Sequence, residues 1–329
     1  TPEEINFDET VSEEDFDAAA AALQQLLAAG QTGQKAMRGG KEGNYPGEHA
    51  YQRQYTLADV YSEYATVPHY DFAYAQYLDY SYSVVKDWYG GPNGQYGLVR
   101  TNFAPLLNHE SIDAIPEIKA IYLLMFDFSS MEVADIYGPM PYTAFINNQD
   151  QPPFAFEALS DVYEKVFGHI ERIIACLKHF SEQPDWYQAK VKQIMSENLL
   201  IVNDASLRSD PNVWIKFANS LKLRMAMHMV KVDAAKAQKL AEEAVADGVI
   251  ESEADQMGFW PTSYSGSHPL YTISETWNDE RLNASFESIL KSLGHPYANA
   301  LYEKNGGALG SLAASAMVIG IRSGEIGRA

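Results

Sequence analysis

The chain has 329 residues and a formal net charge of −20. This acidic excess argues against binding to nucleic acid and against binding to anionic membranes through a basic face. The single cysteine, Cys176, excludes an intramolecular disulfide and a cysteine-based metal site, and its apolar neighbours predict a buried, unreactive thiol.

The first stretch, residues 1–12, predicts an extended acidic leader. It lacks the basic and apolar regions of a secretory signal peptide. Ser12 precedes three acidic residues and predicts the N-cap of a helix that runs to Leu27 and is ended by Gly30. Residues 31–47, which are rich in Gly, Gln and Lys, predict a loop.

A tyrosine-rich stretch follows, since residues 45–96 hold twelve of the 21 tyrosines. Residues 48–64 predict a helix with irregular flanks. Three tyrosines are spaced at i, i+4 and i+7: Tyr70, Tyr74 and Tyr77. They begin a helix predicted over 71–88, and such a stripe favours packing against another helix over ligand binding. Residues 90–94, Gly-Gly-Pro-Asn-Gly, predict a loop.

The most apolar stretch is the helix predicted to start at Pro116, because proline suits the first helical turn. Residues 120–126 are apolar on all sides, which indicates a central buried helix. Acidic residues interrupt the run before the roughly 20 apolar residues that a membrane span needs. Gly138, followed by Pro139 and Pro141, predicts a firm helix end.

An amphipathic helix comes next, with Ser160 or Asp161 as its predicted cap and residues 183–186, Gln-Pro-Asp-Trp, as its end. Its apolar stripe has helical spacing: Tyr163, Val166, Phe167, Ile170, Ile173, Ile174 and Leu177.

One further helix has a clear start. Asp210 and Pro211 supply an N-cap acid and a proline at the first helical position. Within this helix Trp214 is expected to anchor the core, and Asn219 to bond buried backbone groups. Its basic side chains are expected to keep their charged ends in water: Lys216, Lys222, Arg224 and Lys231.

The remaining chain has four predicted parts. A helix of small residues runs from Asp233 to Gly248, and a last helix covers 280–293. Between them, 257–277 predicts a long loop, and 306–329 shows no clear period. With no strand-like alternation of any length, the chain predicts an all-α fold of about eight helices, several in antiparallel pairs like those of TPR proteins.

No motif of a known catalytic or cofactor site is present in the sequence. Asn108, His109 and Glu110 adjoin in sequence but do not face one another on a helix. A carboxylate pair for glycoside hydrolysis could involve Asp279 and Glu280, but charges at a helix start explain them more simply. His228 is expected to be a surface or capping histidine. The sequence therefore predicts no enzyme, no cofactor and no metal site.

Several stretches resemble the SusD/RagB family. Residues 135–142, Asp-Ile-Tyr-Gly-Pro-Met-Pro-Tyr, resemble its Tyr/Phe-Gly-x-x-Pro-Tyr turn after a long apolar helix. Residues 214–227 closely match its W-x-K-F-A-N-S-L-x-L-R-x-A-x stretch. The leader at 4–6 is similar to the start of mature family members, after their lipid-bearing cysteine, and 319–324 resembles a late family element.

The resemblance implies one helical domain over 1–329, with TPR-like helix pairs in a superhelical scaffold and long irregular loops. It implies a Bacteroidetes outer-membrane lipoprotein, its signal peptide removed, that is attached at the cell surface by a lipid upstream of Thr1. Such proteins bind an oligosaccharide or another nutrient, without catalysis or cofactor, and deliver it to a TonB-dependent SusC-like transporter. Because family chains are longer, and 294–297 replaces a usual Asp-Pro-Arg, the domain is expected to be incomplete at its C-terminus.

No binding residue follows from a motif match, because the family's ligand contacts lie in variable loops. Sugar rings stack on aromatic faces, so loop and helix-end aromatics are the candidates: Trp88, Tyr89, Tyr96, Trp186, Tyr187, Trp260, Tyr264 and Tyr271. Core packing is the alternative for each one. The alternative function is a TPR-like protein adaptor that binds no nutrient, and a glycosidase with two carboxylates about 5–10 Å apart is a third.

Overall fold

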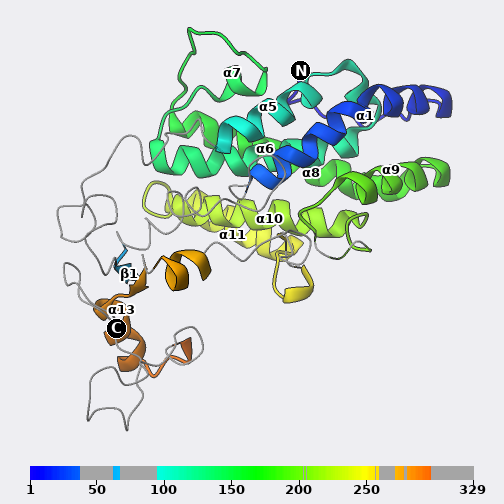
Figure 1. Ribbon diagram of the computed structural model, residues 1–329. Helices are drawn as coiled ribbons and strands as arrows, with labels where there is room; N and C mark the ends of the chain where they lie inside the picture. The colour runs from blue at the N-terminus through cyan, green and yellow to red at the C-terminus, as the bar shows by residue number, and fades with distance from the viewer. Residues whose placement is uncertain are drawn as a thin grey trace. The chain divides into compact units, whose positions relative to one another are not determined.

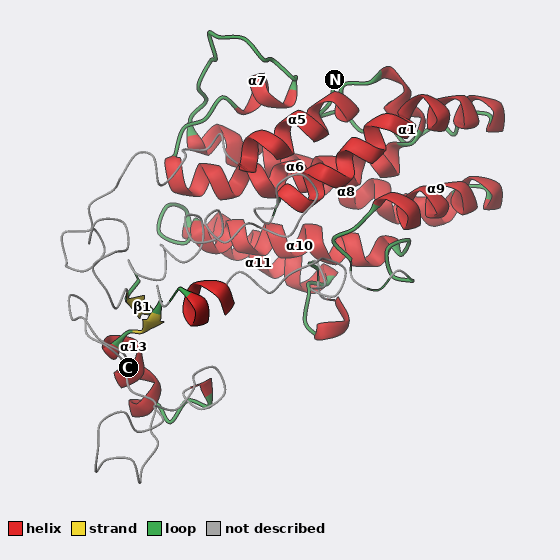
Figure 2. Ribbon diagram, in the orientation of Figure 1, coloured by secondary structure: helices red, strands yellow, loops and turns green. Residues whose placement is uncertain are grey.

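The computed structural model describes residues 1–37, 62–66, 95–202, 204, 206–255, 257–258, 271–277 and 280–297. Contacts divide the chain into two compact units, Thr1–Asn44 with Pro92–Tyr264 and Tyr45–Gly91 with Ser265–Ala329. The described residues are mostly helical (Figure 2), which confirms the all-α prediction. The single domain over 1–329 stays a prediction.

The first unit is a stack of packed helices (Figure 1). Its described elements are α1 (Glu13–Ala36), α5 (Gln95–Leu107), η4 (Glu110–Ala114), α6 (Pro116–Tyr137), α7 (Tyr142–Ile146), α8 (Leu159–His179), η5 (Phe180–Glu182), α9 (Asp185–Asn198), α10 (Pro211–His228), α11 (Ala234–Asp247) and η6 (Glu253–Asp255). Helix α1 packs along α5, α6 lies against α5 and α8, and α10 lies against α8 and α11.

The second unit, taken by itself, has one short sheet among its described residues. Strand β1 (Ala65–Thr66) pairs antiparallel with β2 (Arg281–Leu282), and Ala65 lies opposite Leu282. Helix α13 (Ala284–Ser292) and the π-helical turn η8 (Thr272–Thr276) complete the described part. The helix expected over 280–293 therefore starts later, because the Asn283 side chain caps it by accepting from Ser285 N. The turn η8 lies inside the stretch expected to be a loop.

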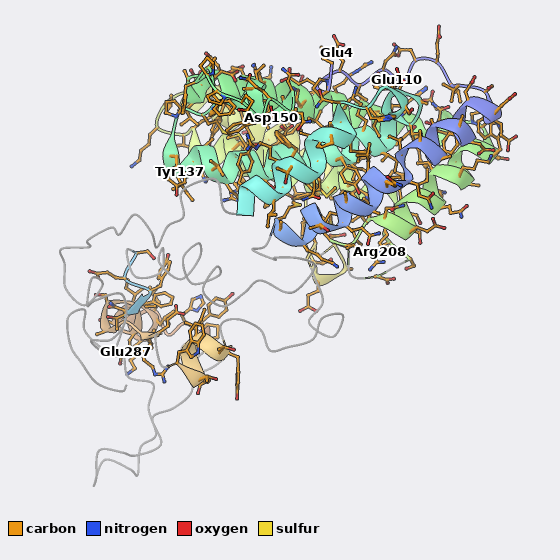
Figure 3. The ribbon with its side chains drawn as sticks, turned by 45° about the horizontal axis from the view of Figure 1, so that its top comes forward. Glu4, Glu110, Tyr137, Asp150, Arg208 and Glu287 are labelled. Atoms are coloured by element: carbon orange, nitrogen blue, oxygen red, sulfur yellow. The ribbon has the colours of Figure 1, made fainter. Side chains whose placement is uncertain are left out.

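Helix α6 is the centre of the first unit, as predicted. Every residue from Pro116 to Met131 is buried. Gly138 ends the helix with a positive φ of 81°, and its N–H donates to Ala134 O at 2.8 Å. Only the last turn emerges into solvent, where Ile136 is 67% and Tyr137 46% exposed (Figure 3). No described helix is both long and apolar enough to cross a membrane.

Helix α1 extends past its predicted end at Gly30 and continues to Ala36. A Cβ at Gly30 would lie 2.6 Å from the Tyr122 hydroxyl, and one at Gly33 would lie 2.5 Å from the Phe103 ring. These glycines therefore allow α1 to approach α6 and α5 closely. The predicted stop at Gly30 was wrong, and so was the predicted loop over 31–36, because the need for close packing outweighs the low helix propensity of glycine.

Two predicted helix caps are confirmed, and Asp233, which was predicted as a helix start, is the N-cap of α11. Ser12 accepts from Asp15 N at 3.1 Å, Asp210 from Asn212 N at 2.9 Å, and Asp233 from Lys236 N at 3.0 Å. The predicted cap at Ser160 or Asp161 was wrong, since α8 starts at Leu159 after Ala158 and has no side-chain cap.

Helix α9 was missed by the sequence analysis, which took residues 183–186 as the end of α8. That helix ends earlier, at His179, and the same residues begin α9. Pro184 at the N-cap and Asp185 in the first turn are start signals as well as stop signals, because proline and an acid both suit a helix N-terminus.

The buried face of α10 agrees with the prediction. Trp214 is fully buried, and the Asn219 amide donates to Gly248 O at 3.0 Å and to Asp247 Oδ2 at 2.9 Å. Lys222 differs from the prediction: its side chain is 9% exposed, and Nζ lies 3.0 Å from Glu243 Oε2. An ion pair with α11 replaces the water that the charged end was expected to keep.

Cys176 is fully buried as predicted, and burial raises the pKa of its thiol, which favours the unreactive protonated form. Six predicted elements fall wholly or mostly outside the described residues: the helices over 48–64 and 71–88, the loops at 31–47, 90–94 and 257–277, and the C-terminal stretch 306–329.

The close approach of α1 can be tested with glycine substitutions. Gly30→Ala and Gly33→Ala should each destabilise the protein by about 1–3 kcal/mol, because the added methyl group overlaps Tyr122 or Phe103. Gly168→Ala in α8 is the matched control, since a Cβ there meets nothing within 4 Å. This substitution should stabilise the protein by about 0.5–1 kcal/mol, because alanine has a higher helix propensity than glycine. Urea unfolding measures all three; equal effects would contradict the packing argument.

Candidate functional site

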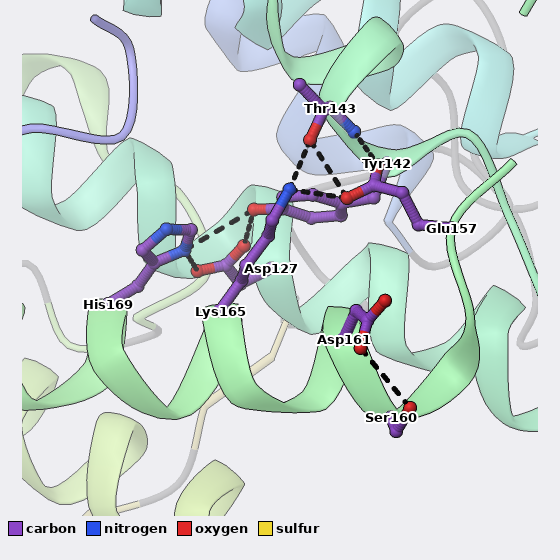
Figure 4. Close-up of polar contacts among 8 residues, drawn as sticks. All are labelled: Asp127, Tyr142, Thr143, Glu157, Ser160, Asp161, Lys165 and His169. Atoms are coloured by element: carbon purple, nitrogen blue, oxygen red, sulfur yellow. Dashed lines mark hydrogen bonds and ion pairs between the residues drawn. The ribbon is translucent and has the colours of Figure 1, made fainter. Parts of the chain in front are cut away.

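A buried polar cluster joins three helices of the first unit (Figure 4). Asp127 of α6 is fully buried and accepts a hydrogen bond from the Tyr142 hydroxyl of α7. His169 Nδ1 of α8 lies 3.0 Å from Asp127 Oδ2 and 3.4 Å from Tyr142 Oη. The turn after Gly138 reverses the chain, and this reversal brings Tyr142 back over Asp127.

Electrostatics in this cluster favour a charged histidine. Burial lowers the pKa of His169, but the charge and hydrogen bond of Asp127 raise it more, so the pKa lies above its ordinary value of 6.5. Burial, followed by the Asp127 charge, holds the pKa of Tyr142 well above 10.0. The cluster is therefore a buried ion pair between Asp127 and a charged His169, with a neutral Tyr142 that donates a hydrogen bond to Asp127.

A second polar group lies next to the cluster and fastens the chain segment between α7 and α8. Thr143 N donates to Glu157 Oε1 at 2.6 Å, and Lys165 of α8 pairs with the same carboxylate. Burial raises the pKa of Glu157, but the bonds from Lys165 and Thr143 outweigh it and lower the pKa below its ordinary value. By contrast, Ser160 and Asp161 contact each other at 3.4 Å at the exposed start of α8 (Figure 4).

This arrangement is suited to holding helices together more than to catalysis. An Asp–His pair can orient a general base, but here the third partner is a fully buried tyrosine whose hydroxyl is committed to Asp127. Among the described residues, no group of three or more His, Cys, Asp or Glu is arranged to hold a metal ion. His109, singled out in the sequence, caps η4 by accepting from Ser111 N at 3.2 Å.

The sequence analysis missed this cluster, although one signal was available. Asp127 was noted only as an interruption of an apolar run. A carboxylate inside a helix buried on all sides needs a partner, because an unpaired buried charge is very costly. That requirement predicts a partner but cannot say that it is His169, which is 42 residues away in the chain.

Two of the aromatic candidates lie in the core of the first unit. Tyr96 is 7% exposed, and its hydroxyl lies 2.9 Å from Ser130 Oγ. Tyr187 is 1% exposed and donates to Glu117 Oε2 at 2.7 Å. Both rings therefore pack against other core side chains, and both hydroxyls have buried partners.

Two other candidates present surface to solvent. Trp186, in the first turn of α9, is half-buried, stacks edge-on against Phe16 at 6.0 Å and has Lys190 Nζ 5.8 Å from its ring. Tyr271, in the second unit, is 61% exposed. The remaining four lie outside the described residues: Trp88, Tyr89, Trp260 and Tyr264.

His228 is half-exposed, as expected, and forms a surface cluster at the ends of α6 and α10. Its Nδ1 lies 3.0 Å from Asp135 Oδ2, and Tyr163 donates to the other oxygen of the same carboxylate at 2.6 Å. These contacts bring the last turns of α6 and α10 together.

Comparison with known proteins gives one family and several solved structures. The profile of the SusD-like family, described as Susd and RagB outer membrane lipoprotein, matches residues 4–327. A chitin-binding SusD homolog from Flavobacterium johnsoniae is 24% identical, with a TM-score of 0.63 over 84% of this chain and 53% of its own. No curated protein matches the chain significantly.

Two further SusD homologs have similar folds. The one from Bacteroides vulgatus is 19% identical with a TM-score of 0.69, and the one from Bacteroides ovatus is 23% identical with a TM-score of 0.65. Each match covers 92% of this chain and 57% of the other. The chain thus spans little more than half the length of these structures.

Single substitutions in the buried cluster of Asp127, Tyr142 and His169 should lower the free energy of unfolding strongly. Asp127→Ala should destabilise the protein by about 3–5 kcal/mol, because it leaves His169 charged and unpaired. Tyr142→Phe should cost about 1.5–3 kcal/mol, the usual contribution of a hydrogen bond to a charged group. Asp161→Ala, at the exposed start of α8, is the control and should change stability by no more than about 0.5 kcal/mol. Similar losses for all three in denaturant unfolding would refute the cluster's structural role.

The buried carboxyl group of Glu117 in α6 should make the stability of the protein depend on pH. It is 1% exposed, and burial raises its pKa above 4.5. A raised folded pKa gives stability that is fully present below the unfolded pKa and is lost as pH rises through the folded value. Glu117→Gln keeps an acceptor for Tyr187 and removes the ionisation, so it should stabilise at pH 7.5 and have little effect at pH 4. Glu171→Gln, at an exposed site of α8, should show no such pH dependence; urea unfolding at both pH values decides.

Proposed function

Because the chain belongs to the SusD-like family of outer-membrane lipoproteins, whose profile matches residues 4–327, we propose that it binds an oligosaccharide at the cell surface without catalysis. The family match is the observation that carries this proposal. Membership also confirms the family and the outer-membrane location predicted from the sequence.

A carbohydrate is the preferred ligand class for two reasons. One structural relative is named as chitin-binding. Exposed aromatic rings are also the side chains on which the C–H faces of sugars stack, with polar groups bonding the hydroxyls around them. Chitin oligosaccharides are therefore the first ligands to test, and the identity of the sugar remains part of the proposal.

We propose Tyr271 and Trp186 as the described aromatic contacts, each in its own unit. Tyr271 is 61% exposed and Trp186 is held edge-on by Phe16, so each offers ring surface to a ligand. Trp88, Tyr89, Trp260 and Tyr264 remain candidates on the sequence argument alone. For Tyr96 and Tyr187 we propose core packing, because both are buried.

The proposed role continues with transport. Binding at the cell surface does not by itself bring a glycan into the cell, and uptake needs a transporter. We therefore propose delivery to a SusC-like TonB-dependent transporter, with the protein attached to the membrane by an N-terminal lipid. The support is the family description as an outer membrane lipoprotein.

A protein-binding adaptor is the second candidate function, and one surface feature favours it. Five exposed apolar side chains lie at the ends of α6 and α10: Ile136, Tyr137, Met227, Val230 and Val232. The pairing of Asp135 with His228 holds these two ends together. Contiguous exposed apolar residues are a mark of protein–protein interaction sites.

Isothermal titration against a glycan panel headed by chitin oligosaccharides tests the binding function. At least one glycan should bind with a Kd of about 1 μM to 1 mM, as expected for a shallow polar site. For a glycan that binds, Tyr271→Ala or Trp186→Ala should weaken binding by about 3- to 10-fold through lost stacking. Tyr297→Ala is the control, since Tyr297 is also exposed (52%) but is not a proposed contact.

The outcomes separate the proposals. Absence of heat with every glycan would count against nutrient binding and leave the adaptor. Binding that survives both substitutions would keep the function and remove Tyr271 and Trp186 from the site.

A further inference from the structure

Arg100 lies in the middle of α5 and stacks on a ring of α7. The two helices pack against each other (Figure 1), and the guanidinium carbon of Arg100 lies 4.1 Å from the centre of the Phe145 ring. Phe145 is 8% exposed, and Phe154, from the segment between α7 and α8, packs edge-on against it with ring centres 5.4 Å apart. A guanidinium stacked on a fixed ring keeps its plane, and its N–H groups point outward in that plane.

Arg100 differs from the other arginines of the described chain in its polar contacts. Four of them bond a backbone oxygen or pair with a carboxylate: Arg172, Arg208, Arg224 and Arg281. Among the described residues, by contrast, the Arg100 guanidinium has no carboxylate partner, and its Nη1 is a buried atom without a hydrogen-bond partner. The stacking on Phe145 is the contact that holds this side chain in place.

The missing partner of Arg100 is energetically costly. A buried donor of a charged group that makes no hydrogen bond loses its hydration without compensation. The chain offers many possible partners, since 44 acidic residues stand against 24 basic ones. An arginine that meets no carboxylate in so acidic a chain points to a partner outside the chain. Its side chain is half-buried, so a ligand can approach the guanidinium from the solvent side.

We propose that Arg100, held flat by Phe145, is a subsite for the carboxylate of an acidic sugar, so that the glycan bound by the protein contains at least one hexuronic acid unit. The inference rests on the proposed glycan-binding function and names one part of its ligand. The planar guanidinium presents two parallel N–H groups that match the two oxygens of a carboxylate. Such bidentate, charge-assisted pairs are stronger than hydrogen bonds between neutral groups.

The net charge of the chain makes such a subsite selective. At a net charge of −20 the protein repels anionic ligands in general. An acidic glycan therefore gains binding free energy only where a cation is free to receive it. Other cations of the first unit are already neutralised, as Lys165 is by Glu157 and Lys222 is by Glu243. Arg100 is thus a place where a carboxylate finds an uncompensated positive charge.

Calorimetric titration with a galacturonic acid oligosaccharide and with its methyl ester tests the subsite. Esterification removes the negative charge and leaves the sugar rings and their hydroxyl groups in place. The acid should bind the unsubstituted protein about 10- to 100-fold more tightly than the ester, the usual effect of a hydrogen bond to a charged group. This comparison needs no substitution and so does not depend on the folding of a variant.

Substitutions locate the subsite. Arg100→Gln should weaken binding of the acid by about 10- to 100-fold and change binding of the ester little, because the charged pair is lost. Arg100→Lys keeps the charge but not the planar fork, so its affinity for the acid should lie between the two. Arg224→Gln is the matched control, since Arg224 already pairs with Glu132, and it should bind the acid as the unsubstituted protein does. Circular dichroism checks that each variant is folded.

Equal affinities for acid and ester would overturn the subsite, as would equal losses in Arg100→Gln and Arg224→Gln. If the acid does not bind while a neutral glycan does, the acidic sugar is ruled out and the proposed glycan-binding function stands. If no glycan of the panel binds, both fail. A short oligoglutamate that binds as tightly as the acid, and loses as much affinity in Arg100→Gln, would overturn the assignment of the subsite to a sugar.

Discussion

The burial of α6 is the constraint on which the first unit depends. A helix that is buried from Pro116 to Met131 needs neighbours on every side, and α5, α8, α9 and α10 supply them. Each large apolar side chain removed from water contributes about 1.5–3 kcal/mol, so the pairing of the other helices with α6 dominates the energetics. Gly30 and Gly33 contribute to this packing, because they let α1 approach the Tyr122 and Phe103 rings closely.

Asp127 is the one carboxylate in the middle of this apolar helix, and it shapes the elements that follow. It requires buried partners, and Tyr142 and His169 provide them from α7 and α8. The turn at Gly138 is therefore more than a helix end. It directs the chain so that a tyrosine covers the acid, and it fixes α7 between α6 and the segment that leads to α8.

The same cluster connects the core to the N-terminal segment. Arg172, one turn after His169 on α8, holds the N-terminal segment by donating a hydrogen bond to Ile5 O. A rigid helical scaffold with a docked N-terminal segment is compatible with a binding protein, because a preorganised scaffold reduces the entropy lost on binding. The proposed ligand contacts are exposed aromatic side chains such as Tyr271.

The sequence alone determined the features that depend on local physics. Three such features follow from short-range spacing and hydrogen bonding: the burial of α6, the helix starts at Ser12, Asp210 and Asp233, and the core role of Trp214. The family also followed from local motifs. Tertiary structure decided the rest: Gly30 is a contact point instead of a stop, Lys222 is buried and pairs with the exposed Glu243, and Asp127 pairs with His169. Each of these depends on which distant segment lies opposite, and the pattern of neighbouring residues carries no information about that.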